Sequence, residues 1–152
     1  MSSIEIQICD AIKANDLARV KSLLPKLENP ERQKWDGYWN KCPLHLAASK
    51  GYDPIVSELL AARFNVKSED DDSRTALYLA SFHGRASTVR LLIDNGADVN
   101  KQTSYLWTPL HYAAYNGQVE IARMLLNSGA DFNIRNDHGD TPLHKAAYSG
   151  IY

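Results

Sequence analysis

The histidines of this chain could in principle support catalysis or metal binding, but their spacing argues against both. His45, His111 and His144 each stand in a separate copy of a similar ten-residue segment. If each copy begins a helix, neighbouring copies lie about 10 Å or more apart, the diameter of one helix. The three imidazoles therefore cannot share one metal ion, and we expect His111 to act as a polar bridge to neighbouring backbone.

The acidic run at residues 69–72 and the two cysteines indicate no reaction either. The run lacks the D-x-D-x-D-G-x5-E spacing of a calcium loop, so we interpret it as a solvated loop that could select basic partners by charge complementarity. Cys9 and Cys42 lie far apart, which fits a reducing compartment better than a disulfide framework or a metal site. Phosphate-binding loops, G-x-S-x-G elbows and paired carboxylate motifs are absent from the sequence. We therefore expect no enzymatic activity, no cofactor and no metal.

A ten-residue segment recurs along the chain at a fixed step. It reads Thr-Pro-Leu-His-Tyr-Ala-Ala-Tyr-Asn-Gly at residues 108–117, and related segments begin at residues 42, 75 and 141. Their closing glycines stand at positions 51, 84, 117 and 150, so the repeat has a constant period of 33. A fixed period in this range is typical of solenoid proteins, in which each repeat contacts only its neighbours.

Each segment carries residues that begin a helix. Thr108 can cap the helix by accepting a hydrogen bond from a backbone amide. Pro109 suits the first helical position, where its missing N–H costs nothing. An apolar residue and two alanines then give a face that allows close stacking. The departures at Cys42, Ala76 and Tyr78 are expected to weaken capping in the first two copies.

With a T-P-L-H-x-A core at period 33, the sequence resembles the ankyrin-repeat family over nearly its whole length. The resemblance implies an all-α solenoid of helix-turn-helix units with short β-hairpin fingers, in one domain over residues 1–152. We expect an N-terminal capping repeat at 1–34, internal repeats at 35–67, 68–100 and 101–133, and a truncated last repeat at 134–152. The chain is expected to be the N-terminal part of a longer protein. A bare face around Leu143 could allow self-association.

The period also predicts individual helices. Residues 1–27 should form two helices, because their apolar residues recur at helical spacing. The later repeats should form helix pairs at 42–50 with 54–62, 75–83 with 87–95, and 108–116 with 119–128. Arg63 stands where the next two repeats carry Gly96 and Gly129. A left-handed helix end favours glycine, so we expect a strained or differently closed end at Arg63.

Composition limits the class of protein and partner. The chain has 152 residues, 44% of them hydrophobic, and a net charge of −1 from 17 basic and 18 acidic side chains. This balance offers nucleic acid no basic stripe. The sequence contains neither an N-terminal signal-peptide pattern nor an apolar span of about 18 residues. We therefore expect a cytoplasmic location, nuclear or organelle-recruited if its partner directs it there, without insertion into a membrane.

The resemblance implies a non-catalytic protein–protein interaction module that binds a protein or peptide. In that family the binding positions are the variable ones, at the finger tips and the ends of the first helices, which line a concave surface. Tryptophan and tyrosine dominate interface hot spots, although these rings could instead pack between neighbouring repeats. The candidate contact residues are Trp39, Lys41, Asp71, Asp72, Arg74, Phe82, His83, Tyr105, Trp107, Tyr115, Asn116, His138 and Tyr148.

The alternative function is that of a targeting or recruiting arm in a larger enzyme or lipid-transfer protein. Residues 107–111 and 136–141 are similar to the N-terminal ankyrin segment of oxysterol-binding-protein-related proteins. Some members of that group bind small GTPases of late endosomes through this segment. Sequence beyond Tyr152 would distinguish the alternatives.

Overall fold

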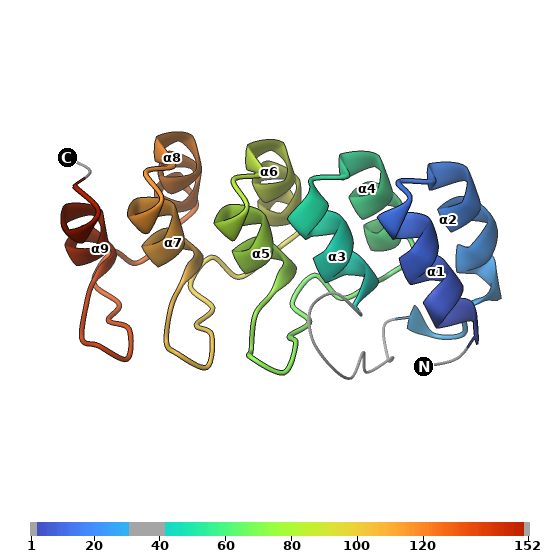
Figure 1. The fold of residues 1–152 in the computed structure, drawn as a ribbon, viewed down its shortest axis with the longest axis horizontal. Helices are drawn as coiled ribbons and strands as arrows, with labels where there is room; N and C mark the ends of the chain where they lie inside the picture. The colour runs from blue at the N-terminus through green and yellow to red at the C-terminus, as the bar shows by residue number, and fades with distance from the viewer. Residues whose placement is uncertain (1–2, 31–41, 151–152) are drawn as a thin grey trace.

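The computed structural model describes residues 3–30 and 42–150, which form a single row of stacked helices. Figure 1 shows α1 and α9 at opposite ends of the row, with the long loops extending from one side. Within these residues there are nine α-helices, one short 3-10 helix and no strand. The elements are α1 (Ser3–Lys13), α2 (Leu17–Leu23), η1 (Leu24–Lys26), α3 (Pro43–Lys50), α4 (Asp53–Ala61), α5 (Ala76–Phe82), α6 (Ala86–Asp94), α7 (Pro109–Tyr115), α8 (Val119–Asn127) and α9 (Pro142–Tyr148).

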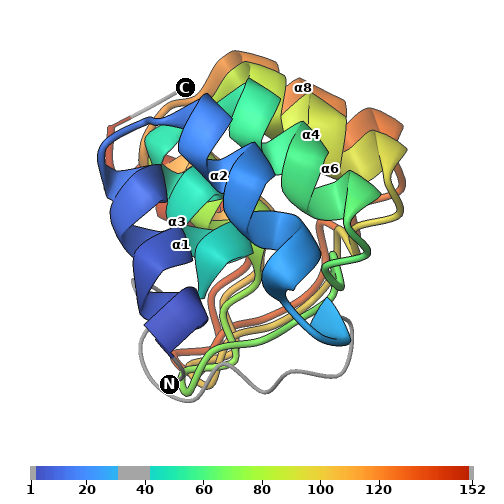
Figure 2. The same ribbon diagram turned by 90° about the vertical axis from the view of Figure 1, so that its right-hand side faces the viewer.

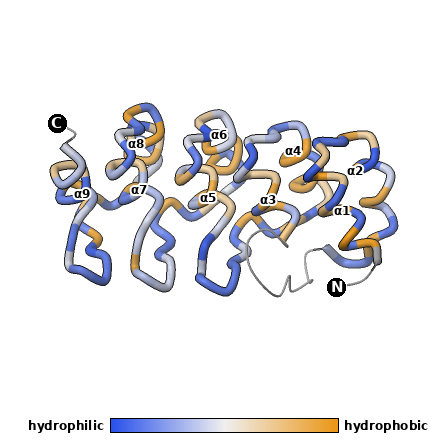
Figure 3. Tube along the Cα trace, viewed as in Figure 1, coloured by the Kyte–Doolittle hydropathy of each residue, from blue (hydrophilic) through white to orange (hydrophobic). Residues whose placement is uncertain are grey.

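The helices form two layers, as Figure 2 shows along the stack. The first helices of successive repeats pack on one another in the order α1, α3, α5, α7 and α9. The second helices pack in the order α2, α4, α6 and α8. Ala47, Ala80 and Ala113 are fully buried in the first layer, so small side chains allow neighbouring helices to approach closely. Figure 3 shows hydrophobic residues concentrated in the helices and largely hydrophilic loops.

All the predicted helix pairs are confirmed, with shifts of one residue at most of their ends. The first helices begin one residue later than predicted because the capping residue itself is not helical. Thr108 has an extended backbone, and its Oγ1 accepts a hydrogen bond from the His111 amide. His111 Nδ1 in turn accepts from the Thr108 amide, which completes a capping box.

The expected weakening of the first two caps is confirmed: the first copy has no side-chain cap, and the second keeps only the threonine half of the capping box. The Cys42 side chain accepts no hydrogen bond from the first turn of α3. Thr75 Oγ1 still accepts from the Tyr78 amide at 3.2 Å. A threonine hydroxyl caps without help from the third residue, so replacing histidine by tyrosine removes only the reciprocal bond.

The expected strained end at Arg63 is confirmed at the C-terminus of α4. Arg63 has a φ of 68°, in the left-handed region that favours glycine. The Phe64 amide donates to the Leu59 carbonyl and the Arg63 amide to the Leu60 carbonyl. These bonds make a Schellman-type ending in which a non-glycine residue occupies the strained position.

The fingers are loops closed by turns rather than β-ladders among the described residues. We name the second finger as residues 68–74, the third as 101–107 and the fourth as 134–140. Each contains one backbone hydrogen bond across its neck, from Asp70 N to Arg74 O, from Thr103 N to Trp107 O, and from Asn136 N to Asp140 O. One such bond is too little to form a strand pair, so the expected β-hairpins are turns.

Candidate functional site

Two of the predicted contact residues, Trp39 and Lys41, lie outside the described residues. The others lie on the fingers and on the first helices α5, α7 and α9. We call the surface formed by the three described fingers and these helices the finger-side surface. It is the place where the predicted contact residues can be compared with their actual environments.

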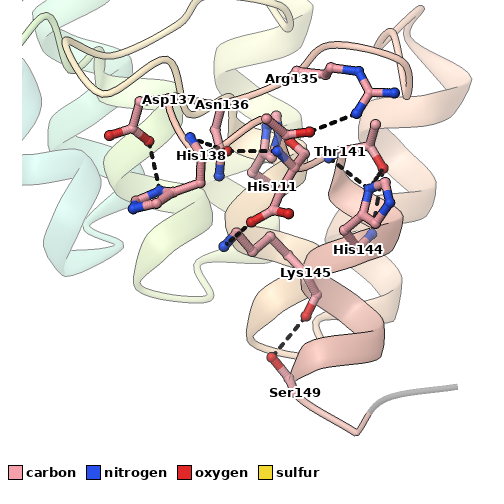
Figure 4. Close-up of polar contacts among 11 residues, drawn as sticks. His111, Arg135, Asn136, Asp137, His138, Thr141, His144, Lys145 and Ser149 are labelled. Atoms are coloured by element: carbon pink, nitrogen blue, oxygen red, sulfur yellow. Dashed lines mark hydrogen bonds and ion pairs between the residues drawn. The ribbon is translucent and has the colours of Figure 1, made fainter.

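A buried polar side chain at the base of each finger fixes its shape. Asp70 Oδ1 accepts from the amides of Asp72 and Arg74, and Asn136 Oδ1 accepts from the amides of His138 and Asp140. Thr103 Oγ1 accepts from the Trp107 amide at 3.3 Å. In a β-hairpin, two paired residues exchange two backbone hydrogen bonds. Here a side-chain oxygen takes the place of the carbonyl that would accept the second one. Figure 4 shows Asn136 at the base of the fourth finger.

The base residues are not among the predicted contact residues. Asp70, Thr103 and Asn136 recur at the period of the repeat and are 7%, 5% and 4% exposed. The interpretation of residues 69–72 as a uniformly solvated run is therefore wrong for Asp70. Its carboxylate is buried because it accepts hydrogen bonds from two backbone amides and from Arg74 Nε, which lies 2.8 Å from Asp70 Oδ2. The periodic recurrence of short polar side chains is the signal that could have identified it.

Backbone hydrogen bonds also join neighbouring fingers. The Ser104 amide donates to the Asp72 carbonyl at 2.9 Å, and the Asp137 amide donates to the Tyr105 carbonyl at 3.1 Å. Lys101 Nζ adds an ion pair to Glu69 at 2.7 Å. The finger tips are thus held in register, so side chains at equivalent tip positions form a row along the stack.

The buried histidines bridge one repeat to the next, as predicted for His111. His45 Nε2 donates to the Arg74 carbonyl at 2.8 Å and His111 Nε2 to the Asp140 carbonyl at 2.9 Å. Their Nδ1 atoms face Cys42 Sγ and Thr108 Oγ1 on their own helices. Burial lowers the pKa of both imidazoles below the ordinary value of 6.5. Each is therefore neutral near pH 7 and holds the following finger in place.

Five aromatic rings form a connected group on the finger-side surface. Tyr112 of α7 lies at its centre, with ring centroids 5.0 Å from Tyr78, 4.9 Å from Phe82 and 4.4 Å from Trp107. Trp107 also contacts Tyr115 edge-on at 6.0 Å. We call these five residues the aromatic cluster. Edge-on and offset contacts of this kind stabilise by about 0.5–1.5 kcal/mol beyond the area they bury.

The predicted aromatic contact residues differ in exposure within and beside this cluster. Phe82 is 41% exposed, Tyr115 39% and Tyr105 62%, so these three rings face solvent. Trp107 is half-buried, and Lys145 Nζ lies 5.0 Å from the centre of its ring. The structure thus places Trp107 in the packing between repeats and leaves the other three available for contact.

Tyr78 and Tyr112 are members of the cluster that the sequence reasoning missed. They lie within the repeated segment, where stacking residues are expected. The candidate contact residues come from the finger tips and helix ends, so these two tyrosines are not among them. Tyr78 stands where three other copies carry histidine. That replacement is the available signal, because a large ring cannot make the histidine bridge and must pack elsewhere.

A small cavity opens between α5 and α7 beside the second finger. Its volume is about 200 Å³, and it is lined by Arg74, Tyr78, Leu79, Phe82, His83 and Tyr112. A second, larger groove of about 370 Å³ lies over α7 and α8 and reaches Ala146 of α9. The smaller cavity brings together three of the predicted contact residues, Arg74, Phe82 and His83.

The charges around this cavity are arranged unevenly. Arg74 lies 2.8 Å from Asp70 and 3.0 Å from Asp72, so both carboxylates share one guanidinium. On the helix side, burial lowers the pKa of His83, and the positive charges of Arg85 and Lys50 lower it further. On the finger side the cavity is therefore lined by Arg74, whose charge is shared with two carboxylates behind it, and Lys50 and Arg85 lie near its other end at His83.

The remaining predicted contact residues lie further along the stack. His138 Nδ1 is 3.0 Å from Asp137 at the tip of the fourth finger, shown in Figure 4. Asn116 caps the end of α7, and Tyr148 is 82% exposed on α9. The structure thus distributes the predicted residues over three repeats, so an occupant of the whole set would have to be elongated.

Residues 3–30 and 42–150 contain no group of three or more His, Cys, Asp or Glu side chains placed to hold a metal ion. Across the same residues, the helices are too short or too polar to span a bilayer.

Family models match most of the chain. One described as "Ankyrin repeats (3 copies)" matches residues 8–103, and another described as "Ankyrin repeats (many copies)" matches residues 92–146. The first covers more than half of the chain. Neither match supports the weaker resemblance to oxysterol-binding-protein-related proteins.

Similar proteins share these repeats over only part of their own length. Protein phosphatase 1 regulatory subunit 12A of Mus musculus is 39% identical over 67 residues, which are 41% of this chain and 6% of that protein. Poly [ADP-ribose] polymerase tankyrase of Caenorhabditis elegans is 34% identical over 88 residues, 58% of this chain and 4% of that protein. Putative ankyrin repeat protein YahD of Escherichia coli K12 is 40% identical over 57 residues, 38% of this chain and 28% of that protein. The repeat period, the stacked helix pairs and the family matches agree that the chain belongs to the ankyrin-repeat family.

Proposed function

We propose that this chain is a non-catalytic module that binds a protein or peptide partner on its finger-side surface. Ankyrin-repeat domains are in general binding modules without catalytic activity. The observation that carries the proposal is the exposure of Phe82, Tyr105 and Tyr115, which are 41%, 62% and 39% exposed on one surface. Exposed aromatic residues that cluster are typical of protein contact sites.

The rigidity of this surface supports the same function. Backbone hydrogen bonds join the second finger to the third and the third to the fourth. The histidine bridge from His111 fixes the fourth finger against α7. A preorganised surface loses little conformational entropy when a partner binds. A net charge of −1 favours a protein partner over nucleic acid.

Site-specific photo-crosslinking tests this function. The photoreactive residue p-benzoylphenylalanine would replace Tyr115 or Tyr105 in the full chain, with Phe132 as the control position because it is 63% exposed and follows α8. We expect one discrete crosslinked protein from both finger-side positions, competed away by unmodified chain but not by Tyr115→Ala chain. Crosslinks that are equal at Phe132, or insensitive to that substitution, would exclude this surface.

The second proposal is that the module serves as the recruiting arm of a larger protein. The chain spans 6% and 4% of the phosphatase regulatory subunit and of the polymerase to which it is similar. In both relatives, the region similar to this chain is therefore a small part of a long protein. Sequencing the transcript beyond the codon for Tyr152 tests the idea directly, since a stop codon there would contradict it.

The last repeat supports a proposal of self-association. Leu143 of α9 is 77% exposed, as expected for a bare face, and Val119 and Leu126 of α8 are 63% and 44% exposed. Apolar surface of this kind favours association with a second copy of the chain. Light scattering should show concentration-dependent dimers that Leu143→Gln abolishes, and a monomer at every concentration would contradict the proposal.

A further inference from the structure

We infer that the partner of the finger-side surface is a peptide segment with one large apolar side chain next to a lysine or arginine. The apolar side chain enters the cavity between α5 and α7, and the basic group pairs with Asp71 at the tip of the second finger. This inference rests on the proposed function, because it specifies the chemistry of the partner of that same surface.

The cavity is suited to a single side chain. Its volume of about 200 Å³ lies below the range of about 300–1,000 Å³ that is usual for pockets holding whole small molecules. Phe82 and Tyr112 line it with rings 4.9 Å apart, and Tyr78 contacts Tyr112 edge-on within it. A leucine, phenylalanine or tryptophan side chain would contact apolar and aromatic surface there, and hot-spot residues commonly enter such pockets.

The second finger beside the cavity carries unbalanced negative charge. Its four carboxylates at residues 69–72 face two cations, since Lys101 pairs with Glu69 and Arg74 pairs with both Asp70 and Asp72. Asp71 is exposed at the tip and takes part in none of these ion pairs. A basic group from a partner could therefore form an ion pair with Asp71. Asp72 is the second acceptor, although it already pairs with Arg74.

The chain itself contains an example of this arrangement. Lys145 Nζ lies 2.7 Å from Asp140, the last residue of the fourth finger, and 5.0 Å from the centre of the Trp107 ring. A lysine thus contacts an aromatic face and a finger carboxylate together, which combines cation–π attraction with an ion pair. Lys145 is thus an example, within the chain, of a cation held by an aromatic ring and a finger carboxylate together.

Basic side chains near the His83 end of the cavity favour a different kind of peptide. Lys50 and Arg85 lie near His83 and would attract an acidic peptide. Arg85 already donates from Nε to the Ser49 carbonyl at 3.1 Å. We favour the basic peptide because the exposed rings attract cations, and because Arg74, the finger residue that lines the cavity, is already paired with Asp70 and Asp72 while Asp71 of the same finger is not in those ion pairs. An acidic preference is the alternative that the experiment must be able to show.

Binding of defined peptide pools to the full chain tests the inference by fluorescence anisotropy. Each pool contains labelled nine-residue peptides in a Gly/Ser background with Leu, Phe or Trp at the centre. The residues flanking the centre are Lys and Arg in the basic pool, Gln in the neutral pool and Glu in the acidic pool. A fourth pool keeps the basic flanks and has Ala at the centre. We expect the basic pool to bind tightest, and its advantage over the neutral pool to shrink as salt is raised from roughly 50 to 300 mM.

Two substitutions separate the contribution of the apolar side chain in the cavity from that of the ion pair with the second finger. Phe82→Ala should reduce the advantage of the basic pool over the alanine pool. Asp71→Asn should weaken the basic pool by about 1.5- to 5-fold, the range of one exposed ion pair, and leave the neutral pool unchanged. Asp94→Asn on α6 and Phe132→Ala are the matched controls, since both residues are exposed away from the cavity. Both control variants should bind like the parent.

The possible failures are distinguishable. If Phe82→Ala weakens binding but the neutral or acidic pool binds as well as the basic pool, the stated partner chemistry is wrong and the finger-side surface remains the binding site. If no pool binds, or Phe82→Ala and Phe132→Ala behave alike, both the inference and the proposed peptide-binding function fail. Circular dichroism of each variant establishes that it is folded before binding is measured. Should Phe82→Ala not fold, Asp71→Asn and the salt series decide the question, because an exposed carboxamide at the tip does not affect packing.

Discussion

His111 Nε2 lies 2.9 Å from the carbonyl oxygen of Asp140, so an imidazole of one repeat holds the end of the finger that precedes the next helix. His45 makes the same bond to Arg74 at 2.8 Å. Both side chains are fully buried. Burial disfavours a charge on either ring, and His111 Nδ1 must stay unprotonated to accept from the Thr108 amide, so the stability of the stack is sensitive to acid.

Stability should fall as the pH drops below about 6.5. Burial lowers the pKa of His45 and His111 in the folded chain from an ordinary value of 6.5. Below that value the unfolded chain binds more protons than the folded chain, so stability is complete above it and is lost toward the folded-state pKa. Urea unfolding should therefore give a lower free energy of unfolding at pH 5 than at pH 7.5. His111→Gln should be less stable at pH 7.5 and show a smaller difference; an unchanged difference would contradict this account.

Arg63→Gly should stabilise the chain by about 0.5–1 kcal/mol, because the backbone there is one that glycine adopts without strain. Arg63 has a φ of 68°, a conformation that costs a residue with a Cβ about 1–2 kcal/mol and glycine almost nothing. The matched control is Arg63→Ala, which removes the long side chain but keeps the Cβ. Thermal unfolding should place the glycine variant above the parent and the alanine variant no higher than the parent. Equal melting of both variants would show that the backbone is not strained there.

Asp70→Ala should destabilise the chain by about 1–3 kcal/mol, because the amides of Asp72 and Arg74 lose their acceptor inside a half-buried turn. Asp70→Asn keeps an acceptor oxygen for the two amides and loses the ion pair and hydrogen bond with Arg74, so it should cost less than Asp70→Ala. Asn136 shows that an asparagine can close a finger of this kind. Chemical denaturation checks both values, and equal losses would assign the effect to the ion pair.

Trp107→Ala and Tyr105→Ala should differ in their effect on stability. Trp107 is half-buried against Tyr112 at 4.4 Å and beneath Lys145, so its loss should cost about 2–4 kcal/mol. Tyr105 is 62% exposed, so its loss should change the free energy of unfolding by less than about 0.5 kcal/mol. Differential scanning fluorimetry of the two variants side by side is the measurement. Early melting of Tyr105→Ala would show that the tip packs on its neighbour.

Local features of the chain could be predicted because their causes lie close together in sequence. The Thr108 cap, the proline at the first helical position and the left-handed ending at Arg63 all depend on contacts within one or two helical turns. The closure of the second finger by Asp70 is equally local, with bonds to the amides of Asp72 and Arg74. It escapes prediction because four acidic residues in a row conceal which one is buried.

By itself, the sequence determined the repeat, its period of 33, the helix pairs and the surface on which variable residues gather. Tertiary structure alone decided which aromatic residues on that surface are available. Trp107 is covered by Lys145 of the following repeat, and Tyr78 and Phe82 meet Tyr112 across the boundary between repeats. These contacts depend on the distance and angle between stacked helices, which the period does not specify. The exposure of a ring depends on what the neighbouring repeat places over it, and so it could be known only once the repeats were stacked.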